Sequence, residues 1–334
     1  MKLTLPISLF ILLSLTFGSL LQADQIIMHR ADSHAPIAVM NDHHHKKQEF
    51  MTSYRFMSMD MKGNIQGNND IATTDIAKDG AYMMAPEKMS MQMNMIGGMF
   101  GLRDTTTLMV MTSYQINEMT SIKKSGEQQN METSGFSDLT ISTIQSLVKK
   151  PNQAWIANAG IRLPLGSIDE SNNGNRLPYA MQLGSGTYDL VLGSTYTKFL
   201  ETLSIGSQVS SIIRTGKNTH GYRLGNTVSI TTWIAKSVQN NWSISTRLSS
   251  YLKTNISGSD STLDSMMSPT TSTNTERKSI FISIGSNYKF TKSILKGSRL
   301  AVELAVPLYQ AAGSNSIQMK SQSSITMGYQ KTFK

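Results

Sequence analysis

The stretch "MAPEKMSMQMNM" (Met84–Met95) places methionine at every second position from Met89 onward. In an α-helix, positions i and i+2 lie on nearly opposite sides, so these methionines could not share a face. In a β-strand, side chains alternate between two faces, and the methionines all lie on one of them. Ser90, Gln92 and Asn94 would then line the other face. The spacing therefore predicts a strand.

The same alternation recurs along most of the chain. In "AWIANAGIRLPL" (154–165), Trp155 and Ile161 alternate with Asn158 and Arg162. No long segment with a helical period appears. Counting segments of this kind predicts about twelve strands. Their expected spans are 49–62, 88–101, 106–120, 135–149, 153–166, 184–198, 201–215, 223–238, 241–254, 277–291, 298–310 and 321–333.

The lengths of the connections decide the architecture. Short breaks fall at 149–153, 198–202 and 237–241, and longer polar stretches at 63–87, 167–183 and 255–276. Short turns at one end and long loops at the other are typical of an outer-membrane barrel. The alternative, a soluble sandwich, usually has strands of about five to six residues. We therefore predict an all-β, antiparallel, up-and-down transmembrane β-barrel, which also explains the 39% hydrophobic content.

The first residues predict export. "MKLTLPISLFILLSLTFGSLLQA" (1–23) has a basic start, an apolar middle and a small residue at its end, as in a secretory signal peptide cut after Ala23. Pro6, Gly18 and the lack of a basic flank disfavour the alternative, an uncleaved anchor. The expected organisation is a signal peptide (1–23), a His-rich periplasmic segment or plug (24–48) and an outer-membrane barrel (49–334).

Composition narrows the function classes. The chain has no cysteine, which excludes disulfides and thiolate metal sites. The net charge of +9 is spread out without a basic cluster, so no nucleic-acid partner is expected. His220 is the only histidine outside the N-terminal segment and has no motif serine beside it. We therefore expect no enzyme.

Histidines concentrate near the N-terminus: His29, His34, His43, His44 and His45, with Asp32 and Asp42 beside them. Neutral imidazoles and carboxylates are ligands for copper, zinc or nickel. The candidate metal ligands here are His34, His43, His44 and His45. The alternative is a segment that only plugs the barrel opening, since a run of three histidines lacks the spaced ligands of a closed zinc site.

Methionines form the second candidate metal site. Fourteen of the 23 lie between Met51 and Met119. Thioethers select Cu(I) or Ag(I), but methionine is also an ordinary apolar filler. Met57, Met59 and Met61 share a face with Arg55, which predicts a lumenal position and makes them candidate copper ligands. Met89–Met95 oppose polar residues, which predicts the lipid side or an apolar packing face, so the methionine stripes are not expected to converge.

Several segments carry a resemblance. They are "HAPIAVMNDHHHKKQEFMTSYRFMSMDMKGN" (34–64), "LPLGSID" (163–169), "LPYAMQLGSGTYDL" (177–190), "GYRLGN" (221–226) and "LAVELAVPLYQ" (300–310). Together they resemble bacterial outer-membrane β-barrels described as transporters, related to the MetA-pathway of phenol degradation group. Ala38 and Asn41 stand where that family often has glycine, and Phe333 lies one residue before the end, where the family tends to end on an aromatic residue. The resemblance implies the barrel fold. It also implies outer-membrane lipid and the barrel assembly machinery as partners, and small aromatic or hydrophobic organic molecules as the transported solutes.

The leading hypothesis is a channel or transporter for small solutes without a cofactor. Arg55, Arg162, Arg247 and Gln115 are expected to line its lumen and to select solutes by charge and hydrogen bonding. The alternative is a copper-binding outer-membrane protein that uses the histidines and lumenal methionines. A second alternative is a structural or adhesive barrel. The oligomeric state stays open.

Overall fold

The computed structural model describes residues 30–80, 82–292 and 294–333, so the predicted signal peptide and His29 lie outside the described residues. The long strands are β1 (Phe50–Gln66), β3 (Met84–Arg103), β4 (Thr106–Lys123), β5 (Gln128–Phe136), β6 (Leu139–Lys150), β7 (Gln153–Leu163), β10 (Asp189–Phe199), β11 (Leu203–Arg214), β12 (Thr227–Gln239), β13 (Trp242–Lys253), β14 (Arg277–Lys289), β15 (Ser298–Ala312) and β16 (Ile317–Phe333). Shorter pieces are β2 (Asn69–Ile71), β8 (Ser171–Asn172), β9 (Asn175–Arg176) and the helical turns η3 (Ala31–Ser33), η4 (Asp75–Asp79), η5 (Tyr179–Met181) and η6 (Pro269–Thr271).

The strands close into a barrel. Each long strand except β5 pairs antiparallel with the next strand of the ring, and β16 pairs with β1 to close it. The sheet has 14 strands, of which β2 and β5 lie off the ring, so the closed barrel has 12. β5 and β6 pair with successive parts of β4 and together act as one interrupted strand. The predicted fold class is confirmed. The predicted strand 135–149 covers β6 but misses β5.

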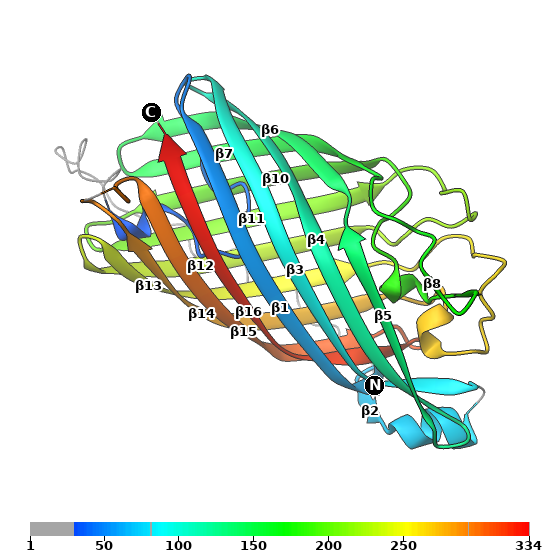
Figure 1. The fold of residues 1–334 in the computed structure, drawn as a ribbon. Helices are drawn as coiled ribbons and strands as arrows, with labels where there is room; N and C mark the ends of the chain where they lie inside the picture. The colour runs from blue at the N-terminus through cyan, green and yellow to red at the C-terminus, as the bar shows by residue number, and fades with distance from the viewer. Residues whose placement is uncertain (1–29, 81, 293, 334) are drawn as a thin grey trace.

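The two ends of the barrel differ. Short turns join β3 to β4, β6 to β7, β10 to β11 and β12 to β13 at one end, where the C-terminus also lies (Figure 1). Longer loops at the other end include 164–188, 215–226 and 254–276. This arrangement is typical of outer-membrane barrels, whose short turns face the periplasm.

The outer face of the barrel is apolar and the inner face is polar. Exposed outward side chains include Tyr54, Ile96, Phe100, Val110, Trp155, Ile161, Leu192, Ile234, Ile244, Leu248, Ile284, Leu304 and Met327. Buried inward side chains include Arg55, Gln115, Asn117, Asn158, Arg247, Asn287, Arg299, Glu303 and Gln330. Because side chains alternate along a strand, each strand presents one set to each side. This is the pattern of a barrel that crosses a bilayer.

Among the described helical segments, none combines the length and the apolar character that a membrane span requires.

Of the two places predicted for Met89–Met95, the lipid side is wrong, whereas an apolar packing face is right for Met89, which lies in a buried methionine cluster. Across β1 and β3, Met89 lies opposite Met61 and Met95 lies opposite Arg55. Arg55 is buried inside the barrel, and directly opposite residues point to the same face, so these methionines point into the lumen. The outward residues beside them, such as Ser90, are polar because the ends of these long strands continue beyond the apolar band.

Residues 30–49 fold into the short-turn end of the barrel and are called the N-terminal plug below. Ile37 and Val39 of the plug are buried, and Val39 packs with Trp233 of β12. The segment predicted as a periplasmic segment or plug thus lies within the barrel where the structure describes it.

The loops fold over the opposite end. Loop 164–188 brings Met181 onto Met89, Met119 and Met131, in a buried cluster that Met319 also joins. Tyr179 packs edge-to-face on Tyr222, with ring centroids 4.8 Å apart. Chain segments therefore cover the lumen at both ends.

Candidate functional site

Hydrogen bonds from several strands hold the N-terminal plug. The Gln208 side chain donates to the carbonyl of Met40 at 2.6 Å, and Arg299 donates to the carbonyl of Ala35 at 2.5 Å. At its start, Arg30 donates to the carbonyl of Glu201 at 2.6 Å, in the turn between β10 and β11. The plug lacks regular structure over most of its length, so these contacts with the barrel wall supply partners for its backbone carbonyls.

The plug turns back on itself at Asn41, which has a positive φ of 55°. This left-handed conformation favours glycine, and asparagine tolerates it better than most residues do. Asn41 stands where the resemblance expects glycine, so the turn is kept despite the substitution. As a result, His34 comes back beside His43, with ring centroids 4.4 Å apart.

Two histidines and an aspartate meet at this turn. Potential ligand atoms of His34, Asp42 and His43 lie within 4.8 Å of one another, and we call these residues the His–Asp cluster. The ring nitrogen Nδ1 of His43 lies 2.7 Å from Asp42 Oδ1. The other carboxylate oxygen accepts a hydrogen bond from the backbone N–H of Ala35 at 2.9 Å. Asp42 is thus held in place from two sides and orients the His43 ring.

Burial sets the charge state around the cluster. Burial, together with the charge of His43, lowers the pKa of His34 to about 3 and the pKa of His45 to about 3. Burial raises the pKa of Asp42, but its interactions with His43 and His34 outweigh burial and hold that pKa well below its ordinary value. At neutral pH, His34 and His45 are therefore neutral and Asp42 is ionised. These are the forms that bind metal ions.

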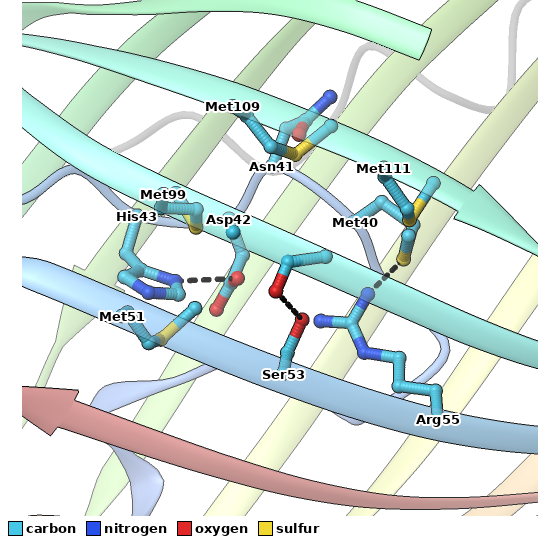
Figure 2. Close-up of a pocket in the computed structure, with 12 residues that line it drawn as sticks. Met40, Asn41, Asp42, His43, Met51, Ser53, Arg55, Met99, Met109 and Met111 are labelled. Carbon is cyan, nitrogen blue, oxygen red and sulfur yellow. Dashed lines mark hydrogen bonds and ion pairs between the residues drawn. The ribbon is translucent and has the colours of Figure 1, made fainter. Parts of the chain in front are cut away.

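A small cavity lies between the cluster and the barrel wall (Figure 2). Asp42 and His43 line it from the plug, and Met51, Met99 and Met109 line it from β1, β3 and β4. Its volume of about 10 Å³ is room for one water-sized occupant. The three methionines, called the methionine trio below, stand side by side because Met51 lies opposite Met99, and Met99 opposite Met109. All three are buried.

The predicted metal ligands do not all come together. His45 packs near His43, with ring centroids 5.1 Å apart, while His44 lies next to the cluster in sequence. Met57, Met59 and Met61 lie on the lumen face but further along β1 than Met51, opposite Met93, Met91 and Met89. Of the predicted histidines, the structure brings His43 to the methionine trio, which sequence reasoning did not single out.

The four predicted lumen residues occupy four separate places. Arg55 is buried and its guanidinium contacts the sulfur of Met40 in the plug. Gln115 is buried and donates to Asn117 Oδ1 at 2.8 Å. Arg247 forms a buried ion pair with Glu303 of β15.

Arg162 lies in a charged row nearer the loops. It stands opposite Asp189 of β10, and Asp189 stands opposite Arg214 of β11. Asp189 is ion-paired with Arg214. Sequence reasoning missed both partners, because alternation along one strand does not show which residues of other strands will lie beside it.

A closed 12-stranded antiparallel barrel with an apolar outer face and a polar lumen defines a membrane β-barrel. The chain belongs to the family described as "Putative MetA-pathway of phenol degradation", which matches residues 62–312.

Solved structures resemble the chain to different degrees. An outer membrane channel from Pseudomonas putida F1 is 13% identical, with a TM-score of 0.60 over 86% of this chain and 97% of that one. The transport unit of the autotransporter AIDA-I from Escherichia coli is 14% identical, with a TM-score of 0.49 over 91% and 95%. A mutant of the monoaromatic hydrocarbon channel TodX is 11% identical, with a TM-score of 0.43 over 86% and 91%. The first likeness shows a common fold. No curated protein matches the chain.

Proposed function

We propose that the chain is a bacterial outer-membrane channel for small solutes, including small aromatic molecules. One observation carries the proposal: the same strands present apolar side chains outward and charged or amide side chains inward. A barrel built only for structure or adhesion does not require charges inside, where each costs free energy unless it is paired. A polar lumen instead gives a passing solute hydrogen-bond partners and charge selection.

Two features support aromatic solutes. The description of the family names a pathway of phenol degradation, and phenol is a small aromatic molecule with one polar group. The lumen offers matching side chains, because the adaptable Met91 and Met93 of β3 lie directly opposite the amides of Asn117 and Gln115 of β4. Such a surface can accept a ring on one side and a hydroxyl or carboxylate on the other.

The N-terminal plug sets how the channel opens. Residues 30–49 occupy the short-turn end of the barrel, so a solute leaves only when the plug shifts or loosens. The plug is held largely by side-chain hydrogen bonds to its carbonyls, such as those from Gln208 and Arg299. Each such bond contributes only about 0.5–1.5 kcal/mol, or somewhat more from a charged donor, so the segment can be released without unfolding the barrel.

Uptake into proteoliposomes tests the proposal. Benzoate at pH 7 is a suitable probe, because the ionised acid crosses a bare bilayer slowly. We expect benzoate to enter liposomes that contain the full chain faster than protein-free liposomes, with a large polymer such as dextran excluded. If benzoate enters at the same rate with and without protein, and a variant with a loosened plug gives that rate too, the result would favour the structural or adhesive barrel instead.

A further inference from the structure

The cavity beside the His–Asp cluster combines two kinds of metal ligand on opposite walls. From the plug, the imidazole of His43 and the carboxylate of Asp42 line the cavity, and His34 lies beside them in the His–Asp cluster. The barrel wall supplies the thioethers of the methionine trio. A packing role explains buried methionines, but it does not explain why buried imidazoles face them.

The imidazoles hold unused ligand atoms. Within the described residues, Nδ1 of His34, Nε2 of His43 and Nε2 of His45 are buried and have no hydrogen-bond partner. His45 is only 5% exposed. A buried polar atom without a partner is unfavourable, because it has lost its hydrogen bonds to water. Two of these atoms belong to His34 and His43, whose potential ligand atoms lie within 4.8 Å of each other and of Asp42, and a bound metal ion would give them a partner.

Asp42 prepares His43 for this role. With the His43 proton on Nδ1 and hydrogen-bonded to Asp42 at 2.7 Å, the lone pair lies on Nε2. A carboxylate that orients an imidazole in this way is the usual supporting contact of a metal-binding histidine. The same arrangement fixes the ring without consuming the nitrogen that binds.

The mixed donor set selects the metal. Imidazole and carboxylate ligands suit Cu(II), Zn(II) and Ni(II), whereas thioethers suit Cu(I) and Ag(I). Copper is the biological metal that suits the ligands on both walls, in its two oxidation states. We propose that the cavity between the His–Asp cluster and the methionine trio is a copper site, with His34 and His43 as principal ligands of Cu(II) and the trio as principal ligands of Cu(I).

The site bears on the channel through its position. His34, Asp42 and His43 belong to the plug, whereas Met51, Met99 and Met109 belong to the barrel. The two groups of ligands therefore lie on the two sides of the contact between the plug and the barrel wall. Copper binding itself does not depend on the proposed channel function, and it can be measured without transport.

Titration of the full-length protein in detergent tests the proposal. Cu(II) is added as the metal alone, and Cu(I) is added in competition with a chromophoric chelator under anaerobic conditions. We expect one equivalent of each ion to bind. A His34→Gln/His43→Gln variant should lose Cu(II) affinity by about tenfold or more. A Met51→Leu/Met99→Leu/Met109→Leu variant should lose Cu(I) affinity by a similar factor and keep Cu(II) affinity.

Matched controls separate the site from general binding. His220→Gln removes a histidine of the loops, and Met266→Leu removes an exposed methionine. Both should bind copper as the unmodified protein does. Heat-modifiable migration on a gel checks that each variant folds.

Spectroscopy of the unmodified protein identifies the copper ligands directly. Electron paramagnetic resonance of the Cu(II) form should show nitrogen ligation, and X-ray absorption of the Cu(I) form should show sulfur neighbours. The proposal is overturned if no stoichiometric copper binds, if neither the double histidine variant nor the triple methionine variant loses affinity, or if the Cu(I) spectrum shows no sulfur.

Discussion

Arg247 on β13 and Glu303 on β15 form an ion pair inside the barrel, with Arg247 Nε 2.9 Å from Glu303 Oε1. Both side chains are nearly fully buried, and Arg247 also donates to Ser283 of β14, the strand between them. The pair thus joins three neighbouring strands across the lumen wall.

Removing one partner should destabilise the barrel. Glu303→Ala leaves the Arg247 charge buried and uncompensated, which costs about 3–5 kcal/mol. The double variant Arg247→Met/Glu303→Leu removes both charges and should recover most of that loss. Urea unfolding in detergent measures the free energies. If the single and double variants unfold at the same urea concentration, the pair does not stabilise the fold as described.

A glycine of β3 allows the plug to enter the barrel. A Cβ atom built on Gly101 would lie 1.8 Å from the Lys46 carbonyl oxygen, and this part of the chain is also held by the hydrogen bond from the Gly101 N–H to the Glu49 carbonyl. Gly101→Ala should therefore force the backbone apart and cost about 1–3 kcal/mol of unfolding free energy.

Gly98 on the same strand is the control. A Cβ there meets Phe50 only at 3.7 Å, which is ordinary contact. Gly98→Ala should therefore unfold close to the unmodified protein. A loss as large as that of Gly101→Ala would mean that alanine is generally unfavourable in this strand and that the plug contact is not the cause.

The loops should open in acid. Asp260 lies beside Arg176 and His220, and Asp169 lies 2.5 Å from His220 Nε2. The hydrogen bond from His220 lowers the pKa of Asp169. Burial raises the pKa of Asp260, but the hydrogen bonds from Thr262 and the charge of Arg176 outweigh burial, so the pKa lies below its ordinary value. A carboxyl with a lowered pKa stabilises the fold fully above its ordinary pKa of about 3.9.

That stabilisation is lost as the pH falls through the lowered values. Hydrogen exchange in loop 254–276, corrected for its intrinsic pH dependence, should be constant from pH 7 to 5 and rise below about pH 3.9. Asp260→Asn should open the loop at neutral pH, whereas Glu127→Gln, in an exposed pair with Lys123, should not. Protection that stays unchanged in acid would show that other contacts hold the loops.

The sequence predicted the fold well and the site only in part. Alternation located every long strand except β5, whose segment "QQNMETSGF" carries only one apolar side chain on each face, Met131 and Phe136. The segment pairs with the part of β4 that lies nearer the loops. The position of a segment along its strand also misled the interpretation of Met89–Met95. A polar side chain indicates the lumen face of a strand only in the part of the strand that lipid surrounds. The sequence does not show where along the strand the lipid bilayer ends.

The His–Asp cluster depends on a turn that no periodic pattern shows. His34 and His43 meet only because Asn41 takes a left-handed conformation. The methionine trio depends on the register between three strands, which determines that Met51 lies beside Met99 and Met109. The residue types were visible in the sequence, but their convergence was not.

Single-channel current across a planar bilayer tests the central claim most directly. Arg30→Ala removes hydrogen bonds that anchor the plug to the turn between β10 and β11, and Lys46→Ala removes the same charge from an exposed position of the plug. We expect the unmodified protein and Lys46→Ala to give the same small current, and Arg30→Ala to give a larger or more frequent one. No current from any of the three proteins, each shown to be folded and inserted, would contradict a channel gated by its N-terminal segment.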